Sequence, residues 1–174
     1  MLAGEDLRKE TSFHKLLENR QMVFWICLGY AKNPVEAEEL AQDVFIKAWS
    51  NLESLRDEEK RREWLLRIAR NTCLDHQKKM RLRRFFESGR AEEPRDEMSP
   101  EKLVLFRGEL RLLKKAVRSL PRKLRDTFIL REYGDLSYKE IAETLGIKEG
   151  TVMSRLNGAR QKIKERMKGL DHGK

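Results

Sequence analysis

The sequence predicts an all-α protein with two small helical domains joined by a flexible linker. Three observations lead to this fold class. Apolar residues recur at spacings of three and four along most of the chain, and no alternating strand pattern of useful length occurs. Hydrophobic residues make up 39% of the 174 residues, which suits two small cores better than one large core. Charge lies in blocks of opposite sign, which indicates separate functional surfaces.

The first helical segment is predicted between Phe13 and Tyr30, where the composition is mixed but largely apolar. It ends near Asn33-Pro34, where Asn33 is expected to cap the next helix and Glu36 to close a capping box. That next helix has the clearest buried stripe of the chain: Ala37, Leu40, Ala41, Val44, Phe45, Ala48, Trp49 and Leu52. Its outer side is expected to carry Glu36, Glu39, Gln42, Asp43 and Lys47.

Another long helix is predicted after the polar stretch from Asn51 to Lys60. Its inner side is expected to hold Trp64, Leu65, Ile68, Ala69, Thr72 and Cys73. Its outer side is expected to show Arg62, Arg67, Arg70, Asn71, Lys78 and Lys79. Helical phase places Trp49 and Trp64 in the core rather than on the surface. Cys27 and Cys73 occupy apolar positions and are expected to be reduced, buried thiols of a cytoplasmic protein.

The segment 87–99 contains Gly, Pro and mixed charge with almost no apolar residue, which predicts a flexible linker. The predicted domains are therefore 1–86 and 100–170. The second domain opens with a helix whose apolar stripe is Leu103, Phe106, Leu110, Leu113 and Val117. Pro121 ends this stripe and starts a helix that carries Leu124, Phe128 and Ile129 inward, before a loop over 133–135.

Residues 137–163 predict a helix-turn-helix. Ser137 and Glu140 form a capping box for a short helix over 138–145, whose inward residues are Ile141, Ala142 and Leu145. Gly146 supplies the left-handed turn that is cheap only for glycine. Ile147 is expected to plug the core. The next helix is expected to bury Val152, Leu156, Ala159 and Ile163, and to insert its N-terminal half into the major groove of DNA.

The net charge of +9 favours an anionic partner. Residues 60–90 hold eleven basic and three acidic side chains, and residues 148–174 hold eight basic and three acidic ones. These two blocks predict two DNA-binding surfaces on two modules. Residues 34–59 hold eight acidic and two basic side chains, so their expected partner is a basic protein surface.

Several classes of function are not expected. No run of eighteen apolar residues and no signal peptide occurs in the sequence. The three histidines and two cysteines lack metal-ligand spacing, and no cofactor is expected. The sequence contains no phosphate-cradling loop and no nucleophile beside a base, so an enzyme is not expected. A helix-turn-helix can also serve a stand-alone transcriptional regulator, which is kept as the alternative function.

The stretch LSYKEIAETLGIKEGTVMSRLNGARQKIKE, with LPRKLRDTFILREYGDLS before it, resembles region four of extracytoplasmic-function (group four) RNA polymerase sigma factors of the sigma-70 family. AEELAQDVFIKAW and EWLLRIARNTCLDHQKK resemble the polymerase-binding and promoter-opening helices of region two. The resemblance implies a non-enzymatic cytoplasmic factor that binds core polymerase through the β′ clamp and the β flap. It also implies promoter-specific initiation under a stress or envelope signal, with an anti-sigma factor as inhibitor.

The resemblance assigns three sets of residues in this sequence. The set implied to bind core polymerase is Glu39, Leu40, Gln42, Asp43 and Phe45. The set implied to bind and open the minus-ten element is Arg61, Arg62, Arg67, Arg70, Asn71, Lys78 and Lys79. The set implied to bind the minus-thirty-five element is Thr151, Met153, Ser154, Arg155, Asn157, Gly158, Arg160 and Lys162.

Overall fold

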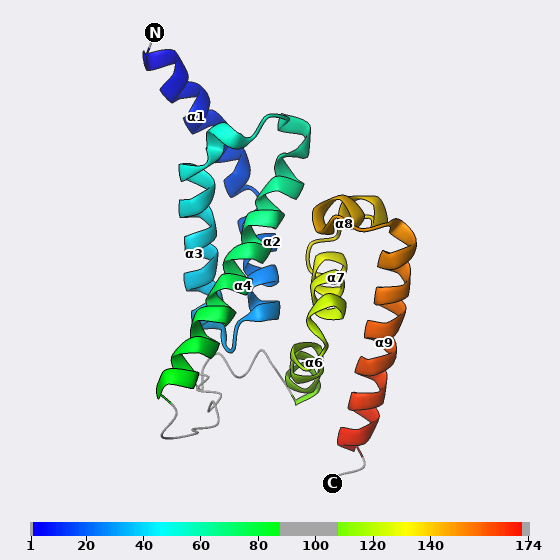
Figure 1. Cartoon of the computed structure of the whole chain (residues 1–174). Coiled ribbons are helices and arrows are strands. Elements are labelled where there is room, and N and C mark those ends of the chain that lie inside the picture. Colours follow the sequence, from blue (N-terminus) through cyan, green and yellow to red (C-terminus); the bar gives the residue numbers. More distant parts are fainter. Residues whose placement is uncertain (1, 88–107, 172–174) are drawn as a thin grey trace. The chain divides into compact units, whose positions relative to one another are not determined.

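A computed structural model describes residues 2–87 and 108–171, and all the regular secondary structure in these two ranges is helical. The chain divides into two compact units, between Arg95 and Asp96. We describe each unit by itself (Figure 1). The linker predicted over 87–99 lies outside the described residues except for Glu87, which ends a helix. Leu103 and Phe106 also lie outside them.

The first unit is a bundle of α2 (Arg20–Tyr30), α3 (Pro34–Ser50) and α4 (Arg61–Glu87), with α1 (Leu2–Leu17) against α3 and α4. Two short 3-10 turns, η1 (Leu52–Ser54) and η2 (Glu58–Lys60), connect α3 to α4. The fully buried core residues include Val23 and Ile26 of α2, Val44 of α3 and Leu65 of α4. The bundle therefore leaves one long face of α3 and one of α4 for partners.

The prediction of one helical segment from Phe13 to Tyr30 was wrong, because a turn at 18–19 separates two helices and the first of them, α1, begins at Leu2. The Asn19 amide N–H donates to the Leu16 carbonyl at 3.0 Å, and the Asn19 side chain donates to the Lys15 carbonyl at 3.4 Å. Such local bonds from an Asn side chain compete with the helical ladder. The break lets α1 leave the direction of α2 and reach α3.

The predicted capping box at the start of α3 was half right. The Asn33 side chain accepts the Glu36 amide at 2.8 Å, as expected. The Glu36 carboxylate, however, accepts the amide of Lys32 and lies 2.8 Å from Nε2 of His76 on α4. Glu36 is thus half-buried against α4 rather than on the outer side of α3. Burial alone raises the pKa of Glu36, but the Lys32 amide and His76 outweigh it and hold that pKa below its ordinary value.

We expect Glu36→Gln to lower the free energy of unfolding at pH 7 by about 1–3 kcal/mol, the typical effect of losing a charged hydrogen-bond partner. Because the folded-state pKa of Glu36 is lowered, its contribution is present above the unfolded-state value of 4.5 and is lost as pH falls below it. Urea unfolding at pH 7 and at steps below 4.5 measures this. The curves of wild type and variant should converge in acid, whereas the exposed control Glu39→Gln should match wild type throughout. A difference in the free energy of unfolding between wild type and Glu36→Gln that stays constant as the pH falls would contradict the expectation.

The two cysteines are free and fully buried, as predicted, with their sulfurs 3.7 Å apart between α2 and α4. The hydrogen bond to Cys27, followed by burial, raises the pKa of the Cys73 thiol. A neutral buried thiol is a poor nucleophile, so this pair acts as core packing.

The prediction that Trp49 lies in the core was wrong, because 39% of it is exposed. Its ring packs edge-on against Phe13 of α1 at 5.0 Å, and Nζ of Lys9 lies 5.3 Å above it. Trp64 is half-buried, and its ring nitrogen donates to the Ser54 hydroxyl at 3.2 Å. Both tryptophans thus join the ends of neighbouring elements instead of filling the bundle.

The second unit contains α6 (Gly108–Arg118), α7 (Arg122–Glu132), α8 (Tyr138–Leu145) and α9 (Glu149–Asp171). The structure confirms the predicted bounds of α8, its capping box between Ser137 and Glu140, and the left-handed Gly146 with φ 64°. Helix α9 packs on α6, α7 and α8. The predicted buried stripe of α9 is confirmed: Val152, Leu156, Ala159 and Ile163. A compact helix-turn-helix with a solvent-facing second helix results.

Candidate functional site

The outer face of α3 is acidic. Glu39, Gln42 and Asp43 are exposed, and Phe45 is half-buried. Leu40, however, is only 2% exposed and lies in the bundle core, so we remove its side chain from the expected contact set. Its packing supports the helix that presents the others.

Sequence periodicity missed two apolar members of this face. Val35 is 53% exposed and Ile46 is 64% exposed. With Glu39 and Gln42 they follow the spacing of four, three and four that places side chains on one side of a helix. Neither residue belongs to the predicted buried stripe, and this is the sequence signal that could have identified them as exposed apolar side chains. A surface that combines apolar side chains with acidic ones is suited to a protein partner, because a nucleic acid is repelled by the carboxylates.

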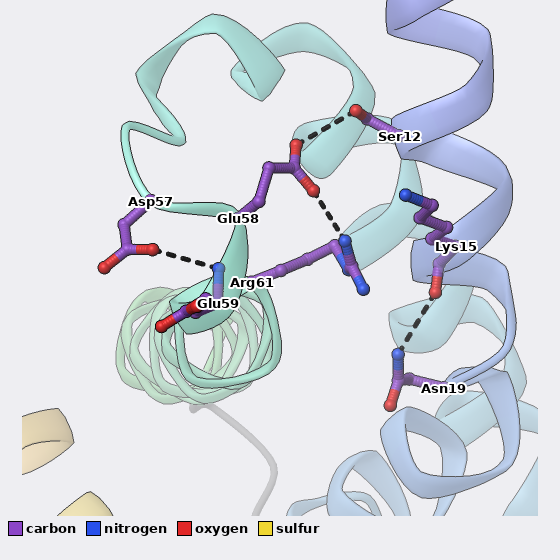
Figure 2. A network of polar contacts seen from close by, with 7 residues as sticks. All are labelled: Ser12, Lys15, Asn19, Asp57, Glu58, Glu59 and Arg61. Carbon is purple, nitrogen blue, oxygen red and sulfur yellow. Dashed lines mark hydrogen bonds and ion pairs between the residues drawn. The ribbon is translucent and has the colours of Figure 1, made fainter.

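The turn that leads into α4 is fixed by a polar network (Figure 2). The Glu58 carboxylate accepts the Ser12 hydroxyl of α1 at 3.0 Å and pairs with the Arg61 guanidinium at 2.5 Å. Asp57 accepts the Glu59 amide at 2.9 Å and so starts η2. Arg61, expected to bind DNA, is thus already paired in the free chain, and α1 anchors the turn that carries it.

The outer face of α4 is basic, but its predicted residues differ in accessibility. Arg67, Asn71, Lys78 and Lys79 are exposed. Arg62 is half-buried against the Met22 sulfur at 3.5 Å, which limits its reach. The half-buried Arg70 donates to the Asn71 side chain at 3.3 Å, and Lys78 lies 3.5 Å from Asp75. The exposed basic side chains of this set therefore begin at Arg67 and continue with Lys78 and Lys79 in the C-terminal half of the helix.

The N-terminal half of α9 presents Met153, Ser154 and Asn157 to solvent, while Thr151 and Arg155 are half-buried. The remaining predicted residues differ from this group. Lys162 is exposed. Gly158 is half-buried, and a Cβ at that position would lie 3.7 Å from the Leu124 side chain of α7. Gly158 thus belongs to the packing between α7 and α9.

Arg160 occupies a different environment from the one expected for a phosphate contact. Its guanidinium lies 3.1 Å from the Glu132 carboxylate of α7, and this hydrogen bond raises the pKa of Arg160. A hollow between α7 and α9 begins at this pair, with an apolar floor and a basic rim. Its lining also includes Phe128, Ile163, Met167, Lys164 and Lys168.

Two further structural findings concern metal-ligand clusters and membrane-spanning helices. In the described ranges 2–87 and 108–171, no three His, Cys, Asp or Glu side chains gather as a metal site. No helix in those ranges is long and apolar enough to cross a membrane.

Both units of the chain match family models of known proteins. The family model for sigma-70 region 2 matches residues 16–83, and the model for sigma-70 region 4 matches residues 110–163. RNA polymerase sigma-H factor of Pseudomonas aeruginosa is 31% identical over 167 residues, covering 89% of this chain and 85% of that protein. The ECF RNA polymerase sigma-E factor of Escherichia coli is 33% identical over 146 residues, covering 78% of this chain and 75% of that protein.

A solved structure of similar fold contains the sigma factor RpoE in complex with the anti-sigma factor NepR from Bartonella quintana. It matches with a TM-score of 0.66 and 28% identity, over 89% of this chain and 95% of that one. The similarity thus extends over both units, in the same order along the chain.

Proposed function

The chain belongs to the extracytoplasmic-function sigma factors of the sigma-70 family and directs promoter-specific initiation by RNA polymerase, and from this premise we propose how its surfaces divide that work. The acidic and apolar face of α3 binds the β′ clamp of core polymerase. The basic face of α4 binds and opens the minus-ten element. The exposed part of α9 binds the minus-thirty-five element. The domain division at 1–86 and 100–170 belongs to this proposal.

One observation carries the proposal. Two neighbouring helices of one unit present outer faces of opposite charge, Glu39 and Asp43 on α3 against Arg67, Lys78 and Lys79 on α4. A surface of mixed sign would suit neither partner well, whereas this separation presents one face to a basic protein and the other to DNA. Holding core polymerase and opened promoter DNA at the same time requires such an arrangement.

The observations also favour a division of roles within α9. Ser154 and Asn157, exposed on the N-terminal half, are suited to base edges in the major groove. Arg155 and Lys162 are suited to phosphates, which position the helix without reading sequence. Arg160 is held by Glu132, so we assign it first to the packing of α7 against α9.

The remaining assignments follow from membership of the family. We infer an anti-sigma factor that inhibits this chain, as the sigma factor RpoE of the matching structure is in complex with the anti-sigma factor NepR. We also place the chain in the cytoplasm, where the polymerase is, and assign bond formation to the polymerase alone. A stress or envelope signal releases the inhibitor. The stand-alone regulator is not favoured, because the comparisons match region two as well as region four.

The hollow lined by Phe128, Ile163 and Met167 is suited to a helix of the β flap. Its floor is apolar, and Arg160, Lys164 and Lys168 stand at its rim. Apolar floors with polar rims are typical of protein contacts rather than of phosphate contacts. The second unit thus offers one surface to DNA and another to polymerase.

Asn157→Ala is expected to change which minus-thirty-five sequences are used, with a loss of discrimination of roughly 1–3 kcal/mol at the contacted base. Arg160→Ala should leave that preference unchanged, because its guanidinium is held by Glu132. Run-off transcription with core polymerase, on a library randomised in both promoter elements, measures both variants. If Arg160→Ala shifts the preferred sequence and Asn157→Ala does not, the two roles are reversed. If wild type gives no specific transcript, the proposed function fails.

A further inference from the structure

Two neighbouring side chains of α1 meet the segment that connects α3 to α4. The Phe13 ring packs edge-on against Trp49, near the end of α3, with centroids 5.0 Å apart. The Ser12 hydroxyl donates to the Glu58 carboxylate of η2 at 3.0 Å. Helix α1 is thus tied both to the helix before the connection and to the turn after it.

A third contact of α1 with this connection is weaker. Nζ of Lys9 lies 3.5 Å from the Glu53 carboxylate of η1. The Glu53 side chain is 90% exposed, and an ion pair so open to water contributes little. The Glu58 side chain is 54% exposed and its partner Ser12 is half-buried, so that bond is better shielded from water. Ser12 is therefore the polar side chain of α1 with the stronger hold on the connection.

The Glu58 carboxylate links this contact to the basic start of α4. One of its oxygens accepts the Ser12 hydroxyl, and the other pairs with Nη1 of Arg61 at 2.5 Å (Figure 2). A guanidinium carries five N–H donors in a fixed fork, so one side chain can hold a carboxylate and a phosphate together. The Arg61 side chain is 25% exposed, which leaves part of the fork open to a partner.

This network gives the Arg61 side chain its direction. A long side chain that is free in solution gives up rotamer freedom when it binds, whereas one that is already held gives up less. The Ser12 hydroxyl fixes one oxygen of Glu58, so the other oxygen stays in place against the guanidinium. Without that hydroxyl, Glu58 can turn away, and Arg61 then loses part of its preorganisation.

We propose that Ser12 is a positioning residue for promoter binding, which acts through Glu58 on Arg61. The hydroxyl holds the carboxylate, the carboxylate holds the guanidinium, and the guanidinium is presented to the promoter with fewer rotamers to lose. The inference rests on the minus-ten role proposed above for Arg61. It adds a residue of α1, a helix that contributes nothing to the three sets of expected contacts.

The test uses holoenzyme formed from the full chain and core polymerase, and measures its affinity for a promoter fragment. Ser12→Ala removes the hydroxyl, and Ser12→Thr keeps one. Thr11→Ala is the matched control, because it removes the neighbouring hydroxyl, which bonds to the Leu7 carbonyl within α1 at 2.7 Å. Arg61→Gln is measured alone and together with Ser12→Ala, which completes a double-mutant cycle.

Ser12→Ala is expected to weaken promoter binding by about fivefold, the size of one net hydrogen bond. Ser12→Thr and Thr11→Ala should stay within about twofold of wild type. In the Arg61→Gln background, the effect of Ser12→Ala should also fall below about twofold, because the group through which it acts is gone. An undiminished loss in that background would come from general destabilisation and overturns the proposal. Equal loss in Thr11→Ala, or unchanged or tighter binding by Ser12→Ala, overturns it too.

Two further outcomes separate this inference from the function on which it rests. Ser12→Ala should bind core polymerase as wild type does, and a loss of that affinity would assign Ser12 to polymerase binding and overturn the proposal. If Arg61→Gln weakens promoter binding and Ser12→Ala does not, only the positioning role fails. If Arg61→Gln binds the promoter as wild type does, the proposed minus-ten role of Arg61 fails, and the inference fails with it.

Discussion

Asp43→Arg is expected to lower the affinity for core RNA polymerase by about 100-fold, since opposing like charges across an interface costs several kcal/mol and each 1.4 kcal/mol is tenfold. Asp43 is exposed on α3, one turn after Glu39 and next to Gln42 on the proposed clamp-binding face. The substitution replaces an attractive charge in the middle of that face with a repulsive one. The fold should persist, because a surface substitution of this kind changes stability by only about half a kcal/mol.

Competition between wild type and variant for a limiting amount of core polymerase measures this effect. Glu10→Arg makes the same change in net charge at an exposed position on α1 and is the control. If both variants lose affinity equally, the loss comes from overall charge and not from a contact at Asp43. If Asp43→Arg competes as well as wild type, Asp43 does not belong to the docking surface.

The helix-turn-helix was predictable because its determinants lie close together in the sequence. Ser137 and Glu140 satisfy each other's backbone groups within one turn, and Gly146 adopts its left-handed conformation for reasons internal to the residue. The stripe ending at Ile163 needs only the period of the helix. Rules that act over ten residues or fewer therefore gave correct bounds for α8 and the correct buried face of α9.

The errors arose where a side chain finds its partner far along the chain. Glu36 matches the pattern of a capping box, yet it bonds with His76, forty residues away. Arg160 belongs to the set expected to bind the minus-thirty-five element, and its sequence neighbours do not show that it pairs with Glu132, twenty-eight residues away. Trp49 was expected inside because periodicity alone cannot show that its ring meets Phe13 of α1 edge-on and stays 39% exposed. Tertiary contacts decided each of these cases.

The candidate surfaces were predictable in sign but not in detail. Counting charges along the chain was enough to find an acidic helix followed by a basic one. Which residues of a surface are accessible depends on how deeply each side chain is buried. The contact set on α3 therefore loses Leu40, which is buried, and gains Ile46, which is exposed. The same limit applies to Phe85 and Phe86 near the end of α4, which are 77% and 82% exposed, because an exposed aromatic and a buried one look alike in sequence.

Leu156→Ala is expected to destabilise the second unit by about 2–5 kcal/mol, the typical effect of removing a large apolar side chain from a packed core. Leu156 is fully buried on α9, where that helix packs against α6, α7 and α8. A loss of this size is a large fraction of the stability of a small domain. The first unit has its own buried residues, among them Leu65 and Val44, so it should remain folded.

Amide hydrogen exchange of the full chain, resolved by segment, separates the two units. Faster exchange is expected across α6 to α9 in Leu156→Ala, with unchanged exchange across α2, α3 and the buried part of α4. The variant should retain affinity for core polymerase through α3 while losing transcription that depends on the minus-thirty-five element. Asn157→Ala, which alters the exposed neighbour, should leave exchange as in wild type. Faster exchange in both units would mean that their folding is coupled, and the chain would then have to be treated as one cooperative domain.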